Sequence, residues 1–278
     1  MKNGRVPLDA ALATPDSKGR YVRRLFSTIA DRYDLITVLL SFGLDRRWKR
    51  RALRLAEPKP GQRALDLACG TGDLVFGLAA HGTHVVGVDI THRMLVLARL
   101  RAETAIASAR QARTPTVCPE QPAPRPHPAR PTPACAEVTA GKPHPVFVQG
   151  DMIELPFADA QFELVTTGYG LRNVPDLAAA LREIRRVLRP GGVFVSLDFN
   201  RPSNVLVRSV YLGYLWLVGG ALGWALHRDA DTYRYVPASI ERYPGAEGVV
   251  ALLKSQGFLD AEWRRVLAGL MAIHVARR

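Results

Sequence analysis

The chain has 278 residues, of which 47% are hydrophobic and 23% charged, so most of it is expected to fold around a substantial core. Its formal net charge of +13 predicts an anionic partner, such as a phospholipid surface or a nucleic acid, or else a basic surface that is simply solvated. Three cysteines occur and none belongs to a Cys-x-x-Cys pair, which argues against a disulfide framework or a zinc site and fits the reducing cytoplasm.

The N-terminal part predicts an arm followed by two helices. Residues 1–20 contain two aspartates and no long apolar run, so we expect a flexible arm and no signal peptide. Apolar residues at helical spacing predict a helix over 22–40, with an interruption at 34–35. A second helix, 45–55, is strongly basic, and its charged face is either solvated or in contact with anionic lipid. The basic side chains are Arg46, Arg47, Lys49, Arg50 and Arg51.

Residues 64–80 have the pattern of a strand, a glycine turn and a helix. The apolar strand is broken by one acid, Asp66, and the turn contains Gly70 and Gly72, which allow positive φ and a bare backbone. An open α/β sheet forms a nucleotide crevice in this way. The acid precedes the glycines, which suits an adenosyl ligand better than a pyrophosphate. Taken alone, the turn fits an ordinary connection equally well.

Two later strands also end in acids. The strand 84–90 ends near Asp89, whose carboxylate can accept both hydroxyls of a ribose, and Met94 on the next helix can lie against an adenine. The strand 147–152 ends in Asp151 and Met152. The remaining predicted elements are strands over 162–168 and 193–197, helices over 176–188 and 249–256, and a final hairpin over 261–266 and 271–275.

Two segments interrupt this alternation. Residues 104–145 predict a disordered, Pro-rich insertion, because 10 of the 20 prolines lie between 115 and 145 and apolar periodicity is lost there. Residues 205–226 form an apolar stretch that is long enough to span a bilayer. However, it lies between strands of one sheet and contains four glycines that would loosen it. We therefore expect an apolar helical lid over a pocket, touching the membrane interface, with plain core packing as the alternative.

A polar and aromatic run, 229–235, follows the apolar stretch. Its residues Asp231, Tyr233 and Arg234 are expected to line a substrate pocket or a contact between two copies of the chain, which would make a homodimer.

The ordered series of strand ends resembles the class I S-adenosylmethionine-dependent methyltransferases. Blocks outside the glycine turn are similar to the ubiquinone/menaquinone biosynthesis C-methyltransferase family: 30–35 with 41–49, 170–174 and 229–240. The resemblance covers roughly residues 21–103 and 146–278. It implies an α/β fold: a mostly parallel seven-stranded sheet with helices on both faces, an N-terminal helical cap and an apolar helical lid. The range 21–278 would then be a single domain.

The resemblance also implies the site residues. Cofactor contacts are implied at Thr71, Asp89, Asp151 and Met152, completed by Asp66, Gly70 and Gly72, while Gly168 stands where many members have a serine. A polar cluster of Tyr33, Arg172 and Asn173 is implied near the substrate, where Arg172 would stabilise a developing phenolate. The general base is either a water molecule or His274, whose alternative is a sheet histidine with its hydrogen bonds satisfied. No metal is expected.

The implied activity is S-adenosylmethionine-dependent methylation of a ring carbon of a polyprenyl quinol. Demethylmenaquinol is favoured over a benzoquinol because no organellar targeting segment is visible. The implied place is the cytoplasm, peripherally on an anionic membrane. An RNA methyltransferase is the competing class, but neither a base-flipping pocket nor an RNA-binding domain is visible, so no nucleic-acid partner is expected. A third alternative is a cofactor-binding scaffold without activity.

Overall fold

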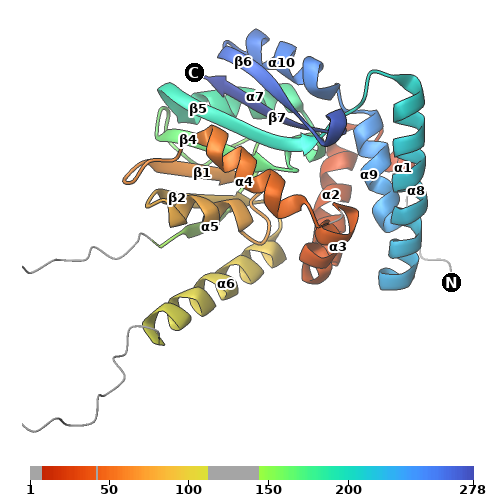
Figure 1. Cartoon of the computed structure of the whole chain (residues 1–278), viewed down its shortest axis with the longest axis horizontal. Coiled ribbons are helices and arrows are strands. Elements are labelled where there is room, and N and C mark those ends of the chain that lie inside the picture. Colours follow the sequence, from red (N-terminus) through yellow and green to blue (C-terminus); the bar gives the residue numbers. More distant parts are fainter. Residues whose placement is uncertain (1–7, 42, 112–143) are drawn as a thin grey trace, which may run out of the picture.

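A mixed seven-stranded sheet forms the centre of the computed structural model, which describes residues 8–41, 43–111 and 144–278 (Figure 1). The strand order is β3-β2-β1-β4-β5-β7-β6, in which β1 to β5 are parallel and β7 is antiparallel to both of its neighbours. The predicted, mostly parallel sheet is therefore confirmed. The strands are β1 (Arg63–Leu67), β2 (His84–Asp89), β3 (Val146–Gln149), β4 (Phe162–Gly168), β5 (Leu188–Phe199), β6 (Leu259–Val266) and β7 (Met271–Arg277).

Helices cover both faces of the sheet because neighbouring strand residues point to opposite sides. In β4, for example, Leu164 belongs to one buried cluster and Val165 to the other. The first face is covered by α4 (Asp45–Ala56), α5 (Asp73–Ala80) and α6 (His92–Gln111), and the second by α7 (Leu177–Val187) and α10 (Gly245–Ser255).

A third group of helices lies beyond the carboxyl ends of the parallel strands (Figure 1). Its own apolar cluster joins the N-terminal helices to α9 through Val22, Leu25, Ile36, Tyr233 and Tyr235. The first part of the predicted helical cap and the predicted lid therefore form one layer, whereas α4, the last helix of that cap, packs on the sheet. The members of this layer are α1 (Leu8–Ala11), α2 (Pro15–Ile29), α3 (Tyr33–Leu40), α8 (Val205–His227) and α9 (Asp231–Glu241). Three short 3-10 helices complete the described chain: η1 (Ala30–Arg32), η2 (Leu171–Asn173) and η3 (Leu267–Gly269).

The expectation of a flexible arm over residues 1–20 is wrong for residues 8–20, which are largely helical. The reason is local. The Thr14 side chain accepts a hydrogen bond from the backbone N–H of Ser17, and the Ser17 hydroxyl accepts one from the N–H of Thr14. This capping box, with Pro15 at the first helical position, begins α2 well before residue 22.

The segment 104–145, predicted to be an insertion, begins inside a helix. Helix α6 continues to Gln111, eight residues into the predicted range, and β3 begins at Val146. The rest of this prediction, 112–143, lies outside the described residues.

Three of the four glycines of α8, at 219, 220 and 223, are packing positions. A Cβ atom on Gly219 would lie 3.1 Å from the carbonyl oxygen of Tyr233, and one on Gly223 would lie 2.4 Å from that of Asp229. Their missing side chains let α9 pack directly against α8. The predicted lid is thus one half of a helical hairpin.

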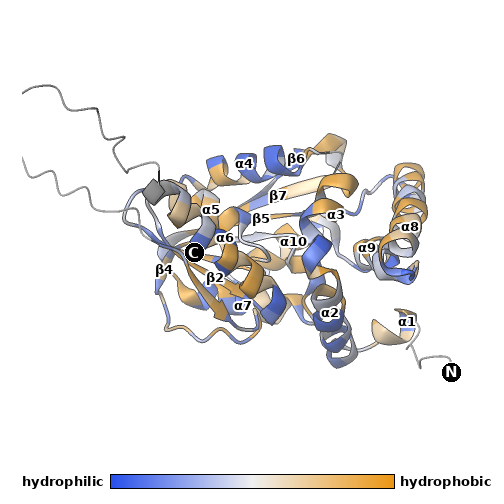
Figure 2. Cartoon of the chain, turned by 90° about the horizontal axis from the view of Figure 1, so that it is seen from below, coloured by the Kyte–Doolittle hydropathy of each residue, from blue (hydrophilic) through white to orange (hydrophobic). Residues whose placement is uncertain are grey.

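The opposite side of α8 is exposed and apolar. Figure 2 shows this helix as a largely hydrophobic ribbon at one end of the molecule. In the described part of the chain, α8 is the one helix that is long and apolar enough to cross a membrane by length and composition alone. The exposed apolar side chains on it are Val205, Leu206, Val207, Val210, Trp216, Leu217 and Trp224.

Candidate active site

The turn between β1 and α5 lies at the carboxyl edge of the sheet. Ala68, Gly70 and Gly72 have φ values of 50°, 54° and 93°. At Gly72 a Cβ atom would lie 2.9 Å from the Phe76 ring, so only glycine fits this position without a shift. The backbone N–H of Gly70 donates a 2.9 Å hydrogen bond to Asp89. The turn therefore joins the end of β1 to the end of β2.

Two backbone donors fix the Asp89 carboxylate. One oxygen accepts from Gly70 and the other, at 2.8 Å, from the N–H of Thr91. Burial raises the pKa of Asp89, although both N–H groups oppose that effect. Each carboxylate oxygen can accept a second hydrogen bond, so Asp89 can still bind a diol.

A single cavity, which we call the cofactor cavity, brings many of the predicted residues together. Gly19, Val22 and Phe26 of α2 line it from the helical layer, and Asp89 and Asp151 are its carboxylates. The predicted residues that line this cavity are Tyr33, Gly70, Asp89, Met94, Asp151, Met152, Gly168 and Asn173.

A smaller cavity beside the turn, the turn cavity, contains Asp66, Thr71 and Asp73 together with Lys49. Asp66 accepts a 2.6 Å hydrogen bond from the Thr166 hydroxyl, and burial raises its pKa to about 7. The two cavities share Tyr33, Gly70 and Gly168 in their linings, so they are adjacent. Gly72 shapes the turn but lines neither of them.

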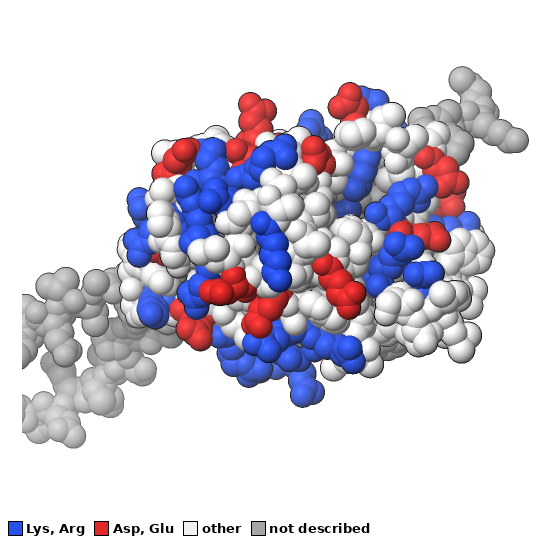
Figure 3. Space-filling model, turned by 90° about the horizontal axis from the view of Figure 1, so that it is seen from above, with Lys and Arg blue, Asp and Glu red and all other residues white. Residues whose placement is uncertain are grey.

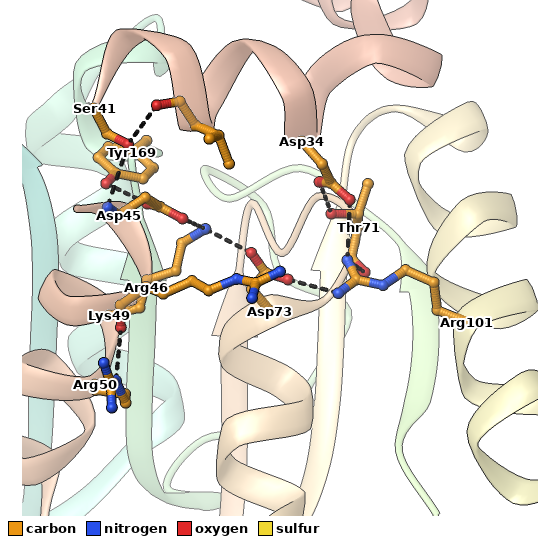
Figure 4. A network of polar contacts seen from close by, with 11 residues as sticks. Asp34, Ser41, Asp45, Arg46, Lys49, Arg50, Thr71, Asp73, Arg101 and Tyr169 are labelled. Carbon is orange, nitrogen blue, oxygen red and sulfur yellow. Dashed lines mark hydrogen bonds and ion pairs between the residues drawn. The ribbon is translucent and has the colours of Figure 1, made fainter. Parts of the chain in front are cut away.

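Lys49 is a site residue that the sequence analysis missed. It was predicted to belong to the basic face of its helix, yet its Nζ lies 2.8 Å from both Asp45 and Asp73 (Figure 4). Burial lowers the pKa of Lys49, but the two carboxylates outweigh this and hold that pKa above its usual value. Helical periodicity could have revealed this buried position, because Lys49 follows Asp45 by one turn and lies on the face that buries Ala52 and Ala56.

Other polar contacts connect the turn to α3 and α6 (Figure 4). The Thr71 hydroxyl donates to Asp34 at 2.7 Å. Arg101 forms an ion pair with Asp73 at 2.8 Å and donates to the Thr71 carbonyl at 2.9 Å. These contacts hold the helical cap against the glycine turn.

Arg172 and Asn173 form a buried cluster on η2. Arg172 Nη1 lies 2.8 Å from Asp198 and 2.9 Å from the Tyr169 carbonyl oxygen, and the guanidinium lies 4.7 Å from the centre of the Phe199 ring. Burial lowers the pKa of Arg172, but Asp198 outweighs it, so Arg172 stays charged. Its Nε has no hydrogen-bond partner among the described residues.

Asn173 is fixed at both ends of its side-chain amide. It donates to the Tyr169 carbonyl at 2.7 Å and accepts from the Tyr235 hydroxyl at 2.9 Å. Asp198 was not predicted from the sequence, and Tyr235 was predicted only as part of the run 229–235, without Asn173 as its partner. Both come from segments distant in the chain, so no local pattern pointed to these contacts.

A further cavity, the aromatic chamber, lies next to the cofactor cavity. The two share Phe26, Tyr33 and Tyr169. Burial raises the pKa of Tyr33, while Lys49 and Arg172 oppose this without cancelling it, so its phenol remains neutral. Further side chains that line the chamber are Trp48, Phe199, Tyr233 and Tyr235.

His274 lies in the sheet and not in the site. Its Nε2 is 3.2 Å from the Ala246 carbonyl oxygen and its Nδ1 is 3.0 Å from the Ser196 hydroxyl. Burial lowers the pKa of His274 to about 4, and the residue lines none of the three cavities described above. Both ring nitrogens have partners, as the alternative of a satisfied sheet histidine predicts, and this geometry argues against His274 as a general base.

Three further residues predicted for the site lie outside these cavities: Arg172, described above, and Asp231 and Arg234. Asp231 and Arg234 form an ion pair at 3.0 Å, and Arg234 lies 4.0 Å from the centre of the Trp216 ring, between α9 and α8. Within the described ranges, no group of three or more His, Cys, Asp or Glu residues is placed to hold a metal ion.

The sequence matches a known protein family. The model of the ubiE/COQ5 methyltransferase family matches residues 14–111 and 137–278. The chain belongs to this family. It is 37% identical to a demethylmenaquinone methyltransferase of Thermus thermophilus over 91% of this chain and 100% of that one. It is 38% identical to a 2-phytyl-1,4-naphtoquinone methyltransferase of Synechococcus elongatus, with 91% and 95% covered. A ubiquinone/menaquinone biosynthesis C-methyltransferase UbiE of Rubrivivax gelatinosus is 33% identical, with 92% and 86% covered.

Solved structures confirm the fold of this ubiE/COQ5 family member. A methyltransferase from Aquifex aeolicus superposes with a TM-score of 0.52 at 12% identity, covering 82% of this chain and 88% of that one. One from Mesorhizobium loti gives 0.51 at 17% identity, covering 82% and 96%. The cofactor is S-adenosylmethionine, and the cavity residues fit it. Asp89 can accept the ribose hydroxyls, and the buried Met94 offers an apolar surface to the adenine.

Proposed function

We propose that this enzyme methylates a ring carbon of a polyprenyl quinol and that its substrate is demethylmenaquinol. The observation that carries the proposal is the aromatic chamber, which adjoins the cofactor cavity at Phe26, Tyr33 and Tyr169. The buried Arg172 guanidinium lies behind its wall, against the Phe199 ring. The names of the relatives support the naphthoquinol, since two of the three described above act on demethylmenaquinone or a naphthoquinone by name. A benzoquinol is the alternative substrate.

The chain's own residues supply binding and electrostatics. When bound, S-adenosylmethionine supplies a methyl group activated on a sulfonium sulfur. A quinol ring carbon becomes more nucleophilic as a neighbouring hydroxyl ionises, and the charge of Arg172 stabilises the phenolate. Its buried Nε is the unused donor of that side chain. Asn173 and the neutral phenol of Tyr33 orient the ring. Since the geometry of His274 argues against it as the base, we assign removal of the ring proton to a water molecule.

A labelled-methyl assay tests this function. Purified protein is given S-adenosylmethionine with demethylmenaquinol, the corresponding benzoquinol or RNA. We expect the label in menaquinol, with fragmentation in the mass spectrometer placing the new methyl group on the ring. Label in RNA, or no label in either quinol, would refute the proposal.

The same assay tests Arg172. We expect Arg172→Ala to lower turnover by roughly 100-fold while S-adenosylmethionine affinity stays unchanged. Arg172→Lys should rescue poorly because an ammonium lacks the planar guanidinium geometry. Normal turnover in both variants would remove Arg172 from the mechanism.

We also propose that the protein works in the cytoplasm at an anionic membrane surface. The exposed apolar side of α8 supports this, as do the exposed side chains of Arg46, Arg47 and Arg50 on α4. Figure 3 shows Lys and Arg spread over one face of the molecule with Asp and Glu among them, and an uncharged area at one corner of the end where α8 lies. A helix of this kind binds the interface by burying its apolar side, and basic residues add attraction to anionic lipid.

Vesicle sedimentation tests the membrane proposal. We expect reversible binding to vesicles of phosphatidylglycerol and phosphatidylcholine, weakened by salt because the electrostatic part is screened. Binding that resists both high salt and alkali would instead indicate a spanning helix. Light scattering without vesicles tests the alternative that the apolar side of α8 joins two copies of the chain.

A further inference from the structure

An uncharged groove lies on the far side of the aromatic chamber from the cofactor cavity. It runs between the first half of α8 and the segments that carry Trp48, Phe199 and Leu267. The space in it, about 1110 Å³, is partly open to solvent. Every residue that lines this groove is aliphatic or aromatic, and none carries a charge. It therefore offers no partner for a charged ligand but a long surface for an apolar one.

The groove is continuous with the site. It shares Leu40, Trp48 and Phe199 with the aromatic chamber, and the chamber shares three residues with the cofactor cavity. Polar groups decrease along this path. Asp89 and Asp151 lie in the cofactor cavity, hydroxyl groups of tyrosine and threonine lie in the chamber, and the groove has only two tyrosine hydroxyls.

The outer rim of the groove is exposed and apolar. Leu206 is 74% exposed and Val210 is 66% exposed, both on α8, and Leu267 on η3 is 36% exposed. Large apolar side chains gathered at the mouth of an apolar groove mark a binding surface, since leaving them in water is unfavourable. The mouth opens on the same apolar side of α8 that we assign to the membrane.

We propose that this groove binds the isoprenoid chain of the substrate while the ring occupies the aromatic chamber. The substrate then enters from the bilayer past α8, with its isoprenoid chain pointing toward the membrane. The α2 side of the cofactor cavity stays free for S-adenosylmethionine. This inference rests on the proposed quinol activity, because only a ring that bears an apolar chain needs both spaces at once. The isoprenoid chain has no group that can form a hydrogen bond, so it binds the groove through apolar contact alone.

Photoaffinity labelling tests the path directly and does not depend on turnover. The probe is a demethylmenaquinone with two isoprenoid units and a diazirine at the chain end. After irradiation, we expect labelled peptides from residues 205–215 and 267–271. Labels concentrated in residues 19–26, at the α2 side of the cofactor cavity, would overturn the proposal.

Charged groove variants provide a second test. We expect Val207→Asp and Val210→Asp to raise KM for the two-unit substrate at least tenfold but to change KM for a chain-free demethylnaphthoquinol by less than twofold. Both positions are exposed, so the variants should fold. The control is Leu259→Asp, which is 63% exposed and lies outside the groove on β6.

The two proposals fail in different ways. Wild-type protein could methylate both the chain-free and the two-unit substrate while the groove variants change KM for the two substrates equally. In that case the groove assignment is wrong and the quinol activity stands. If wild-type protein methylates neither substrate, the quinol activity itself is wrong.

Discussion

The Arg172 Nη1 atom lies 2.8 Å from Asp198 Oδ1, and both side chains are almost completely buried. Asp198 also accepts a 3.2 Å hydrogen bond from the backbone N–H of Arg172. One carboxylate at the end of β5 thus holds both the backbone and the charge of the η2 residue. Asp198 is a positioning residue, because it acts through Arg172.

Replacing Asp198 should therefore affect turnover more than binding. We expect Asp198→Asn to lower kcat at least about tenfold, because the amide no longer balances and aligns the guanidinium, while the Kd for S-adenosylmethionine changes less than twofold. Steady-state kinetics and calorimetric titration measure the two quantities. Glu183→Gln, which removes one of the two carboxylates paired with Arg186 at a partly exposed position on α7, is the control. Equal losses in kcat and cofactor affinity would indicate a general structural effect.

The cofactor site makes a separate prediction at Asp89. We expect Asp89→Ala to weaken S-adenosylmethionine binding by about 1–3 kcal/mol, the range for losing hydrogen bonds to a charged group. Calorimetric titration measures the change, and Glu241→Ala, at an exposed position at the end of α9, serves as control. Wild-type affinity in the Asp89 variant would remove this residue from the cofactor site.

Lys49 should matter for stability more than the exposed arginines around it. Lys49→Met leaves the buried Asp45 without its ion-pair partner. It also removes one of the two ion-pair partners of Asp73, the other being Arg101. We expect the free energy of unfolding to fall by about 3 kcal/mol, as for other broken buried ion pairs. Urea unfolding measures it, with Arg46→Met as the exposed control. Similar stabilities for the two variants would contradict the buried role of Lys49.

The glycines of α8 allow a test within one helix. Gly223→Ala places a Cβ atom 2.4 Å from the Asp229 carbonyl oxygen, so we expect a loss of roughly 1–3 kcal/mol in stability. Gly213 has no atom within 4 Å of the same added carbon, and Gly213→Ala should instead stabilise the helix by up to about 1 kcal/mol. Opposite signs in urea unfolding support the packed hairpin. A stabilising effect at both positions would mean that the connection leading into α9 does not approach α8 as closely as described.

His274 predicts a pH dependence of stability. Burial lowers the pKa of His274 from 6.5 to about 4, so the unfolded chain binds the proton more readily than the folded one. The part of the free energy of unfolding that depends on neutral His274 is fully present above pH 6.5. It is lost as the pH falls toward 4, by about 3 kcal/mol in total. His274→Gln should remove that part of the slope. Asp66 titrates in the opposite sense, because its pKa is raised to about 7.

The difference between wild type and His274→Gln therefore isolates the histidine. Urea unfolding at several pH values between 4.5 and 7.5 measures it. Parallel curves for the two proteins would mean that His274 is not buried in its neutral form.

The sequence by itself determined the sheet and most of the polar residues that line the cofactor and turn cavities. Asp66, Asp89 and Asp151 were predictable because parallel strands deliver their carboxyl ends to one edge, so acids at successive strand ends must meet there. The turn residues Gly70 and Gly72 followed from the local need for positive φ. Such features depend on a few neighbouring residues and on the direction of each strand.

The tertiary structure decided the remaining roles because they depend on distant partners. Lys49 resembles its basic neighbours in sequence, but Asp73, from another helix, makes it a buried ion-pair residue. His274 carries the chemistry of a base, yet its place in β7 between Ser196 and Ala246 occupies both ring nitrogens. Three of the four glycines of α8 change from weak points to contacts once α9 and the connection leading into it pack on them. Burial and pairing of this kind arise only when chain segments meet, so local sequence patterns do not contain them.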